Sequence, residues 1–396
     1  MTRALGGCRS RHLELKFGRM GRVVKVLVTG ASGFIGRNLV AALKRRDDVR
    51  PILFDVDTGP AVLDAGLAES DLIYHLAGVN RPVDEREFMT GNAGMTGRML
   101  ERLVALGRTP TFVLSSSTQA ELDNPYGRSK KAAEEAVSEF GDRTGAPVCV
   151  YRLPGVFGKG SRPAYNTVVA TFCHNIARGM PIAVNDPARE LELVYIDDVV
   201  SAFLRHLDAV PDPAVKRYGV DRTFRVALGE LAERIRRLHA IRETQTVPDL
   251  ADDLMVCLHA TYLSFLPEDG FADPVKLNTD NRGWLFELIK SEHFGQIFVS
   301  KTLPGITRGN HYHDTKVEKF CVIRGQGVIR FRRIDSDKIL EYPVDDRAIK
   351  VVDIPPGYTH SIENSGEGEM ICLFWANRIF DPVRPDTYFT PVLPQG

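Results

Sequence analysis

The sequence predicts an α/β doubly wound parallel sheet followed by an all-β barrel. Up to about residue 245, short β-branched apolar runs alternate with amphipathic stretches, the pattern of parallel strands joined by crossover helices. After Pro267 the sequence changes to short strands separated by Gly, Pro and Asn-Asp breaks, which is typical of an antiparallel barrel or sandwich. A chain of 396 residues is long enough for two or three domains with separate cores.

Four segments are expected along the chain. The first nineteen residues carry several arginines and a lysine but no continuous apolar run, so they do not resemble a secretory signal. Met20 begins MGRVVKVLVTG, which looks like a natural domain start, and residues 1–19 are therefore expected to be a disordered leader or a start-site artefact. We expect a dinucleotide-binding domain at 20–245, a helical connector at 246–267 and a metal-binding β domain at 268–396.

Composition favours a small-molecule partner. Lys plus Arg and Asp plus Glu both number 51, so the formal net charge is zero and no basic surface for nucleic acid or an anionic membrane is predicted. The six cysteines form no C-x-x-C pair, which favours a reducing cytoplasm. No apolar run reaches the length of about 18 residues expected of a membrane span.

A glycine-rich turn follows the first predicted strand. The run at 23–29 ends in Gly30, Gly33 and Gly36, and an amphipathic helix comes next. Glycines let the backbone approach a pyrophosphate, which then lies at the helix N-terminus. The same spacing occurs in tight turns without a ligand, but its place after the first strand favours a dinucleotide site. Further cofactor contacts are expected from Phe34, Ile35, Arg37, Ala77 and Gly78.

The sequence leaves the choice between NAD and NADP open. Asp55 closes the second predicted strand, where a carboxylate holds a ribose hydroxyl and favours NAD. Cations at Arg37 and in the cluster Lys44, Arg45 and Arg46 favour the 2′-phosphate of NADP. A solvated helix end explains that cluster equally well.

Tyr126 and Lys130 form a candidate proton-donor pair. They are four positions apart on the helix predicted after Asn124-Pro125, so they share a face. A tyrosine has a reference pKa of about 10, and a neighbouring ammonium is expected to lower it. This chemistry suits ketone reduction, with a hydride from nicotinamide and a proton from tyrosine. Such a pair also occurs on helix surfaces, but its combination with the glycine loop and a preceding SSS favours a reductase.

These motifs resemble the extended short-chain dehydrogenase/reductase family, in the branch that acts on nucleotide sugars. The resemblance implies a Rossmann fold and a catalytic triad of Ser117, Tyr126 and Lys130. It also implies substrate contacts from Asn92 and Asn166. The short loop between Ser117 and Tyr126, and a leucine at position 191 where many members carry arginine, predict a pocket unlike the common epimerase or dehydratase pocket.

A candidate metal site lies in the second half of the chain. His311 and His313 are two apart, so a strand directs both rings to one face, and Glu318 follows a polar turn. His360 comes near the end of another predicted strand. Three imidazoles and one carboxylate suit Zn²⁺, with other divalent ions open. The alternative is two strand histidines and an unrelated glutamate.

This spacing resembles the cupin family. The pattern G-x5-H-x-H-x4-E-x6-G runs from Gly305 to Gly325, and P-x-G-x2-H-x3-N runs from Pro355 to Asn364. A second resemblance is to cupins that epimerise nucleotide 4-keto-6-deoxysugars, and it implies that Arg282 and Arg308 lie near a diphosphate and Lys319 near the carbonyl.

The base of such a reaction stays open. Those cupins use a histidine base and a tyrosine acid without metal, whereas here the matching histidine is expected to bind the ion. The remaining candidates are Lys319, Tyr312, Tyr358 and a metal-bound hydroxide.

From Met20 onward the chain resembles bifunctional enzymes of capsule synthesis. The resemblance implies a homodimer that epimerises C3 of a UDP-2-acetamido-2,6-dideoxy-4-hexulose and then reduces C4 with NADPH, or with NADH, to UDP-2-acetamido-2,6-dideoxy-L-talose. That sugar leads to UDP-N-acetyl-L-fucosamine. A C3 proton is acidic only while C4 is a ketone, so epimerisation must come first. Two alternatives are a 4-keto-sugar reductase with a structural or dimerising cupin, and a non-catalytic dinucleotide-binding sensor.

Overall fold

The computed structural model describes residues 22–165, 167–214 and 216–393. The expected leader and Asn166 lie outside the described residues. Contacts divide the chain into two compact units. The first contains residues up to Ala232 together with Ala260–Phe265, and the second contains Glu233–His259 and the chain from Leu266 onward.

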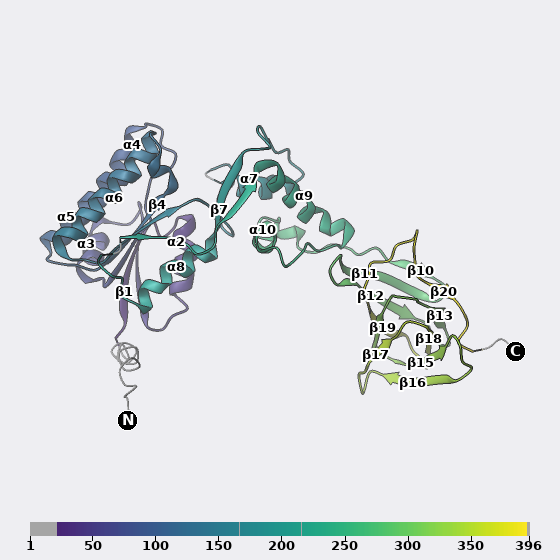
Figure 1. The fold of residues 1–396 in the computed structure, drawn as a ribbon. Helices are drawn as coiled ribbons and strands as arrows, with labels where there is room; N and C mark the ends of the chain where they lie inside the picture. The colour runs from purple at the N-terminus through teal and green to yellow at the C-terminus, as the bar shows by residue number, and fades with distance from the viewer. Residues whose placement is uncertain (1–21, 166, 215, 394–396) are drawn as a thin grey trace, which may run out of the picture. The chain divides into compact units, whose positions relative to one another are not determined.

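The first unit is built on a six-stranded parallel sheet with the order β2-β1-β3-β4-β5-β8 (Figure 1). Its strands read as short buried runs because a parallel sheet is covered on both faces. The strands are β1 (Val24–Thr29), β2 (Val49–Phe54), β3 (Leu72–His75), β4 (Thr111–Ser117), β5 (Val148–Leu153) and β8 (Arg217–Tyr218).

Two hydrophobic cores lie on opposite faces of this sheet. Alternate residues of one strand enter different cores, since Val26 and Val28 pack into one and Leu27 into the other. The first core includes side chains of α2 (Phe34–Leu43) and α8 (Ile196–Asp208). The second includes side chains of α3 (Pro60–Glu69), α5 (Met95–Ala105) and α6 (Pro125–Thr144). The predicted doubly wound α/β fold is therefore confirmed.

Further helices, turns and a small sheet lie outside the parallel sheet and its covering helices. A three-stranded sheet has the order β6-β7-β9. No helix of the described residues is both long and apolar enough to cross a membrane. The remaining elements before the β domain are α4 (Arg86–Phe88), a π-turn (Met89–Gly94), a 3₁₀ turn (Thr118–Glu121), β6 (Gly155–Phe157), α7 (Val168–Ile176), β7 (Glu190–Tyr195), β9 (Phe224–Ala227), α9 (Leu228–Thr244), α10 (Asp253–Leu263) and a 3₁₀ turn (Glu268–Gly270).

The second unit contains two antiparallel sheets, with the orders β10-β11-β12-β19-β14-β17 and β16-β15-β18-β13-β20 (Figure 1, green to yellow). The strands are β10 (Asn278–Asp280), β11 (Gly283–Ser291), β12 (Gly295–Thr302), β13 (Thr307–Tyr312), β14 (Glu318–Arg324), β15 (Gln326–Arg333), β16 (Ile339–Asp345), β17 (Val351–Ile354), β18 (Tyr358–Asn364), β19 (Met370–Ala376) and β20 (Tyr388–Phe389).

The core of the second unit is formed by alternate residues of both sheets. Phe320 and Phe374 from one sheet and Ile329 and Ile362 from the other belong to one buried cluster. This alternation is the pattern of a sheet with one face toward the core. The expected all-β fold of the C-terminal region is confirmed.

A buried ion pair joins three elements of the first unit. Glu134 on α6 accepts hydrogen bonds from Arg152 on β5, with Nη2 of Arg152 2.6 Å from Oε2. Glu134 also accepts a hydrogen bond from the hydroxyl of Ser116 on β4. The side chains of Glu134 and Arg152 are only 7% and 18% exposed. Removing one partner would leave a desolvated charge, which is more destabilising than losing an exposed pair.

We expect Arg152→Ala to lower the free energy of unfolding by about 3–5 kcal/mol, because the Glu134 carboxylate loses its counter-charge inside the fold. Arg205→Ala is the control, since Arg205 pairs with Asp221 at 2.7 Å while both side chains are more than half exposed. That control should cost about 0–1 kcal/mol. Urea denaturation of the full chain measures both, and equal losses would contradict a structural role for the buried pair.

Candidate active site and candidate metal centre

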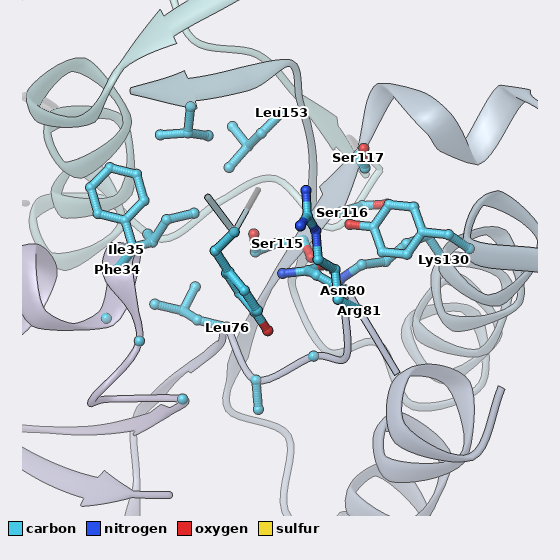
Figure 2. Close-up of a pocket in the computed structure, with 18 of the residues that line it drawn as sticks. Phe34, Ile35, Leu76, Asn80, Arg81, Ser115, Ser116, Ser117, Lys130 and Leu153 are labelled. Atoms are coloured by element: carbon cyan, nitrogen blue, oxygen red, sulfur yellow. The ribbon is translucent and has the colours of Figure 1, made fainter. Parts of the chain in front are cut away.

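A cleft of about 950 Å³ lies at the carboxyl ends of the parallel strands of the first unit. Ligands of open α/β sheets bind at this edge. Figure 2 shows Phe34 and Ile35 on one side and Ser117 and Lys130 on the other, with Asn80 and Arg81 between them. The predicted residues that line the cleft are Gly30, Gly33, Phe34, Ile35, Gly36, Arg37, Asp55, Ala77, Gly78, Ser117, Tyr126 and Lys130.

The glycine turn has the geometry that a pyrophosphate site needs. Gly30 has φ of +69°, and a Cβ there would lie 2.7 Å from the backbone nitrogen of Ala77. A Cβ on Gly36 would lie 2.1 Å from the carbonyl oxygen of Gly30. Helix α2 can therefore begin close to β1, with its N-terminal amides at the cleft.

Asn92, expected from the sequence to contact substrate, is buried and is not among the residues that line the cleft. It is 2% exposed and lies in the π-turn. Its Oδ1 accepts from the Val79 amide at 2.8 Å, and its Nδ2 donates to the Val79 carbonyl at 3.1 Å and to the Ser129 hydroxyl at 2.9 Å. These bonds use the polar atoms of its amide group, so Asn92 braces the loop after β3 against α6.

The residues expected to distinguish NAD from NADP are partly engaged within the protein. The Asp55 carboxylate accepts hydrogen bonds from the amides of Ser32, at 2.6 Å, and Val56. Burial raises the pKa of Asp55, but the hydrogen bonds from Ser32 and Val56 outweigh it and hold the pKa below its usual range. Arg37 donates to the Gly160 carbonyl at 2.9 Å and lines the cleft. Arg46 instead pairs with Asp48 and Asp208, so this member of the basic cluster is committed to ion pairs.

Tyr126 and Lys130 lie on one face of α6, as predicted. The Lys130 ammonium lies 5.9 Å from the centre of the Tyr126 ring and donates to the Ser115 carbonyl at 3.1 Å. Ser117 ends β4, and its hydroxyl accepts from the Gln119 amide and interacts with Tyr126. The structure therefore brings the three predicted residues to one wall of the cleft.

The protonation of this pair differs from the expectation. Burial raises the pKa of Tyr126, and the hydrogen bond with Ser117 only partly opposes it. Burial also lowers the pKa of Lys130 to about 8, although Glu134 acts in the other direction. Lys130 is thus a weaker cation than expected, because the ammonium loses solvation inside the fold. A protonated Tyr126 suits a group that donates a proton.

The four predicted metal ligands of the second unit lie together. His311 is on β13, Glu318 begins β14, His360 is on β18, and His313 follows β13 directly. One candidate ligand atom from each residue lies within 4.8 Å of the others. His313, Glu318 and His360 are buried, and His311 is half-buried.

The donor set fits a divalent ion. The Nε2 atoms of His313 and His360 are buried and have no hydrogen-bond partner among the described residues, and Glu318 Oε2 lies 3.4 Å and 3.5 Å from them. Buried polar atoms without a partner are costly, and an ion would satisfy both. Burial and the neighbouring imidazoles lower the pKa of His311 to about 4, so its ring is neutral, as metal binding requires.

Two groups beside this cluster were missed by sequence reasoning. Lys316 is 9% exposed, and its Nζ lies 3.7 Å from Glu318 Oε1 and 3.2 Å from the Thr387 hydroxyl. The backbone carbonyl of Asp386 accepts from His313 Nδ1 at 2.6 Å. Lys316 lies in the polar turn between His313 and Glu318. Asp386 is 73 residues from His313, so no short sequence motif connects the two residues.

Lys319 does not lie beside the cluster, which corrects the expectation that it would face the substrate carbonyl. It follows the buried Glu318 on β14, so its side chain points to the opposite face of the strand. There it is exposed and forms an ion pair with Asp353. Of the other candidate bases, Tyr312 stacks on Tyr388 with ring centres 5.2 Å apart, and Tyr358 packs against Phe331.

Arg282 and Arg308 are brought near one another. Arg282 pairs with Asp280, and Arg308 Nη2 lies 4.0 Å from the same carboxylate. Arg308 also donates from Nε to the Thr302 hydroxyl at 3.0 Å. Burial and the Arg282 charge lower the pKa of Arg308.

Comparison with protein families supports this division. Residues 26–218 match the NAD dependent epimerase/dehydratase family, and residues 278–388 match the polysaccharide biosynthesis C-terminal domain. The prediction of an NAD(P)-dependent enzyme is therefore confirmed. A Bacillus cereus UDP-glucuronic acid 4-epimerase solved with NAD is 18% identical and has a TM-score of 0.51 over 61% of this chain and 98% of its own, a likeness of fold.

Two relatives match along nearly the whole chain. The Staphylococcus aureus capsular polysaccharide assembling protein CapF has a TM-score of 0.86 and 43% identity, covering 93% of this chain and 100% of its own. A Pseudomonas aeruginosa UDP-2-acetamido-2,6-β-L-arabino-hexul-4-ose reductase is 43% identical over 365 residues, which are 92% of this chain and 98% of the relative. Since this match extends through both units, the chain belongs to the family of that UDP-keto-sugar reductase.

Proposed function

We propose that the protein is a bifunctional nucleotide-sugar enzyme of surface-polysaccharide synthesis. The β domain would epimerise C3 of a UDP-2-acetamido-2,6-dideoxy-4-hexulose, and the parallel-sheet domain would then reduce C4 with NADPH. The product would be UDP-2-acetamido-2,6-dideoxy-L-talose. The observation that carries the reductase is the meeting of Ser117, Tyr126 and Lys130 at a dinucleotide cleft. The name of the Pseudomonas relative supports the choice of substrate.

The reduction requires a hydride at C4 and a proton on the ketone oxygen. NADPH, when bound along the glycine turn, would supply the hydride. Tyr126 would donate its hydroxyl proton to the oxygen, with Ser117 orienting the phenol and the Ser115 carbonyl holding Lys130 against the same wall. Arg37 at the cleft supports NADPH, whereas Asp55 favours NADH, so the two cofactors can be compared directly.

The epimerisation moves one proton and no electrons. The proton at C3 is acidic while C4 is a ketone, so a base removes it and a proton returns to the opposite face of the carbon. His311, His313, Glu318 and His360 would hold a divalent ion such as Zn²⁺, which polarises a carbonyl as a Lewis acid when bound. Arg282 and Arg308 are the cations proposed to bind the diphosphate. The proposed boundaries are 20–245 for the reductase domain, 246–267 for the connector and 268–396 for the metal-binding domain.

We further propose a cytoplasmic homodimer. The cysteines of the described chain are free, which fits a reducing compartment. An apolar row crosses the outer face of the antiparallel sheet β10-β11-β12-β19-β14-β17 of the second unit, and Val351 on it is 61% exposed. A second copy of the chain could bury this row. Its members, paired in register across five strands, are Phe286, Val299, Leu373, Cys321 and Val351.

Tyr126→Phe should lower the rate of C4 reduction by about 10²- to 10⁴-fold, because the proton donor is lost while the cleft keeps its shape. The rate is followed by consumption of NADPH, with NADH assayed in parallel and expected to be used less well. Binding of NADPH should be unchanged. Full activity of the variant would revive the alternative of a non-catalytic dinucleotide sensor.

Metal removal should abolish deuterium uptake at C3. The full chain, incubated with UDP-2-acetamido-2,6-dideoxy-4-hexulose in D₂O without NADPH, should incorporate deuterium at C3 faster than the sugar alone, as measured by NMR. Chelation or Glu318→Gln should stop the exchange, whereas Tyr126→Phe should leave it intact. Exchange that persists without metal would support a structural ion, and no exchange with metal would contradict the epimerase.

Val351→Glu should convert the dimer to a monomer, because it places a charge in the apolar row. Ile334→Glu is the control, since Ile334 is also apolar and 49% exposed but follows β15 in the other sheet. Sedimentation velocity measures the mass of each form. A monomeric wild type, or a dimer that persists in Val351→Glu, would rule out this interface.

A further inference from the structure

Asp386 lies in the chain segment that follows β19 and comes two residues before β20. It is a non-glycine residue with φ of +43°, in the left-handed region. Asparagine and aspartate tolerate this region better than most residues do. The following strand β20 pairs with β13 through His311 and Phe389, so the segment leads to the edge of the sheet beside a candidate metal ligand.

The carboxylate of Asp386 holds the turn between His313 and Glu318. Its Oδ1 accepts from the Asp314 amide at 2.9 Å. Its Oδ2 accepts from the amides of Thr315 at 3.0 Å and Lys316 at 2.8 Å, and from the Thr315 hydroxyl at 2.8 Å. Three consecutive backbone donors therefore converge on one side chain, which fixes the path of the chain from one ligand to the next.

The backbone carbonyl of Asp386 acts on a ligand directly. It accepts from His313 Nδ1 at 2.6 Å, which places the ring proton on Nδ1 and leaves the lone pair on Nε2. Nε2 is the buried atom without a hydrogen-bond partner in the described chain. A histidine ligand is commonly oriented in this way by a carbonyl on its other nitrogen.

We infer that Asp386 is a positioning residue of the metal centre, and this inference rests on the proposed ion. One residue with a left-handed backbone directs its carbonyl at His313 and its carboxylate at the turn that leads to Glu318. It thereby controls two of the four ligands without being one of them. The neighbouring Thr387 hydroxyl, 3.2 Å from Lys316 Nζ, extends the same contact. His360 differs, because its Nδ1 partner is the Tyr358 carbonyl of its own strand.

The test measures metal affinity in the full chain, by competition between the zinc-loaded protein and a chromophoric chelator. Asp386→Gly keeps a backbone that accepts positive φ and removes the carboxylate, and we expect it to weaken zinc binding by about 10- to 100-fold. Asp386→Asn should give a smaller loss, because one oxygen remains to accept an amide. The absorption spectrum of the Co²⁺-substituted protein should change in both variants, because the geometry of the ligands changes.

Asp345→Ala is the matched control. The Asp345 carboxylate also accepts two backbone amides, from Arg347 and Ala348 at 2.9 Å each, but Asp345 is the last residue of β16. This control should keep wild-type zinc affinity and the wild-type Co²⁺ spectrum. Wild-type affinity in Asp386→Gly, or an equal loss in the control, would overturn the inference. Deuterium exchange at C3 is not needed for this test, so a failed epimerase assignment would be seen separately.

Discussion

The buried carboxylate of Glu134 joins β5 to α6 and β4, the two elements that carry the candidate reductase residues. It lies one turn beyond Lys130 on α6, accepts a hydrogen bond from Ser116 on β4, and pairs with Arg152 on β5. Ser116 stands between Ser115, whose carbonyl holds Lys130, and Ser117, which contacts Tyr126. A charge this deeply desolvated tolerates little movement, because its attraction to Arg152 must offset the lost hydration. The same interaction that stabilises the sheet therefore sets the geometry of the site.

The candidate metal centre also depends on buried polar groups that need partners. In the first unit the buried charge has its partner within the protein, whereas the second unit leaves imidazole nitrogens facing one another with Glu318 among them. The chain supplies the groups around these nitrogens, including the carbonyls of Asp386 and Tyr358 that fix the ring protons. The Nδ1 atoms of His313 and His360 have carbonyl partners, whereas their buried Nε2 atoms have no hydrogen-bond partner in the described chain. This arrangement is prepared for an added ion.

Local periodicity explains which features could be predicted from the sequence. The parallel strands and the Tyr126–Lys130 face follow from spacing along one element, and the glycine turn and the candidate metal ligands follow from short motifs. The burial of Asn92 could not be predicted, because its partner Val79 lies in another segment. The exposed position of Lys319 follows from strand alternation, which places its side chain on the face opposite that of Glu318. Asp386 could not have been found, because no local pattern connects it with His313.

Residue spacing does not predict burial, and burial changes the pKa values of Tyr126 and Lys130. A lysine four residues from a tyrosine is expected to lower the tyrosine pKa, but desolvation acts on both groups and favours their neutral forms. The result is a Tyr126 that retains its proton and a Lys130 with a pKa of about 8. A protonated phenol at this wall of the cleft is in the state from which a proton can pass to a ketone oxygen.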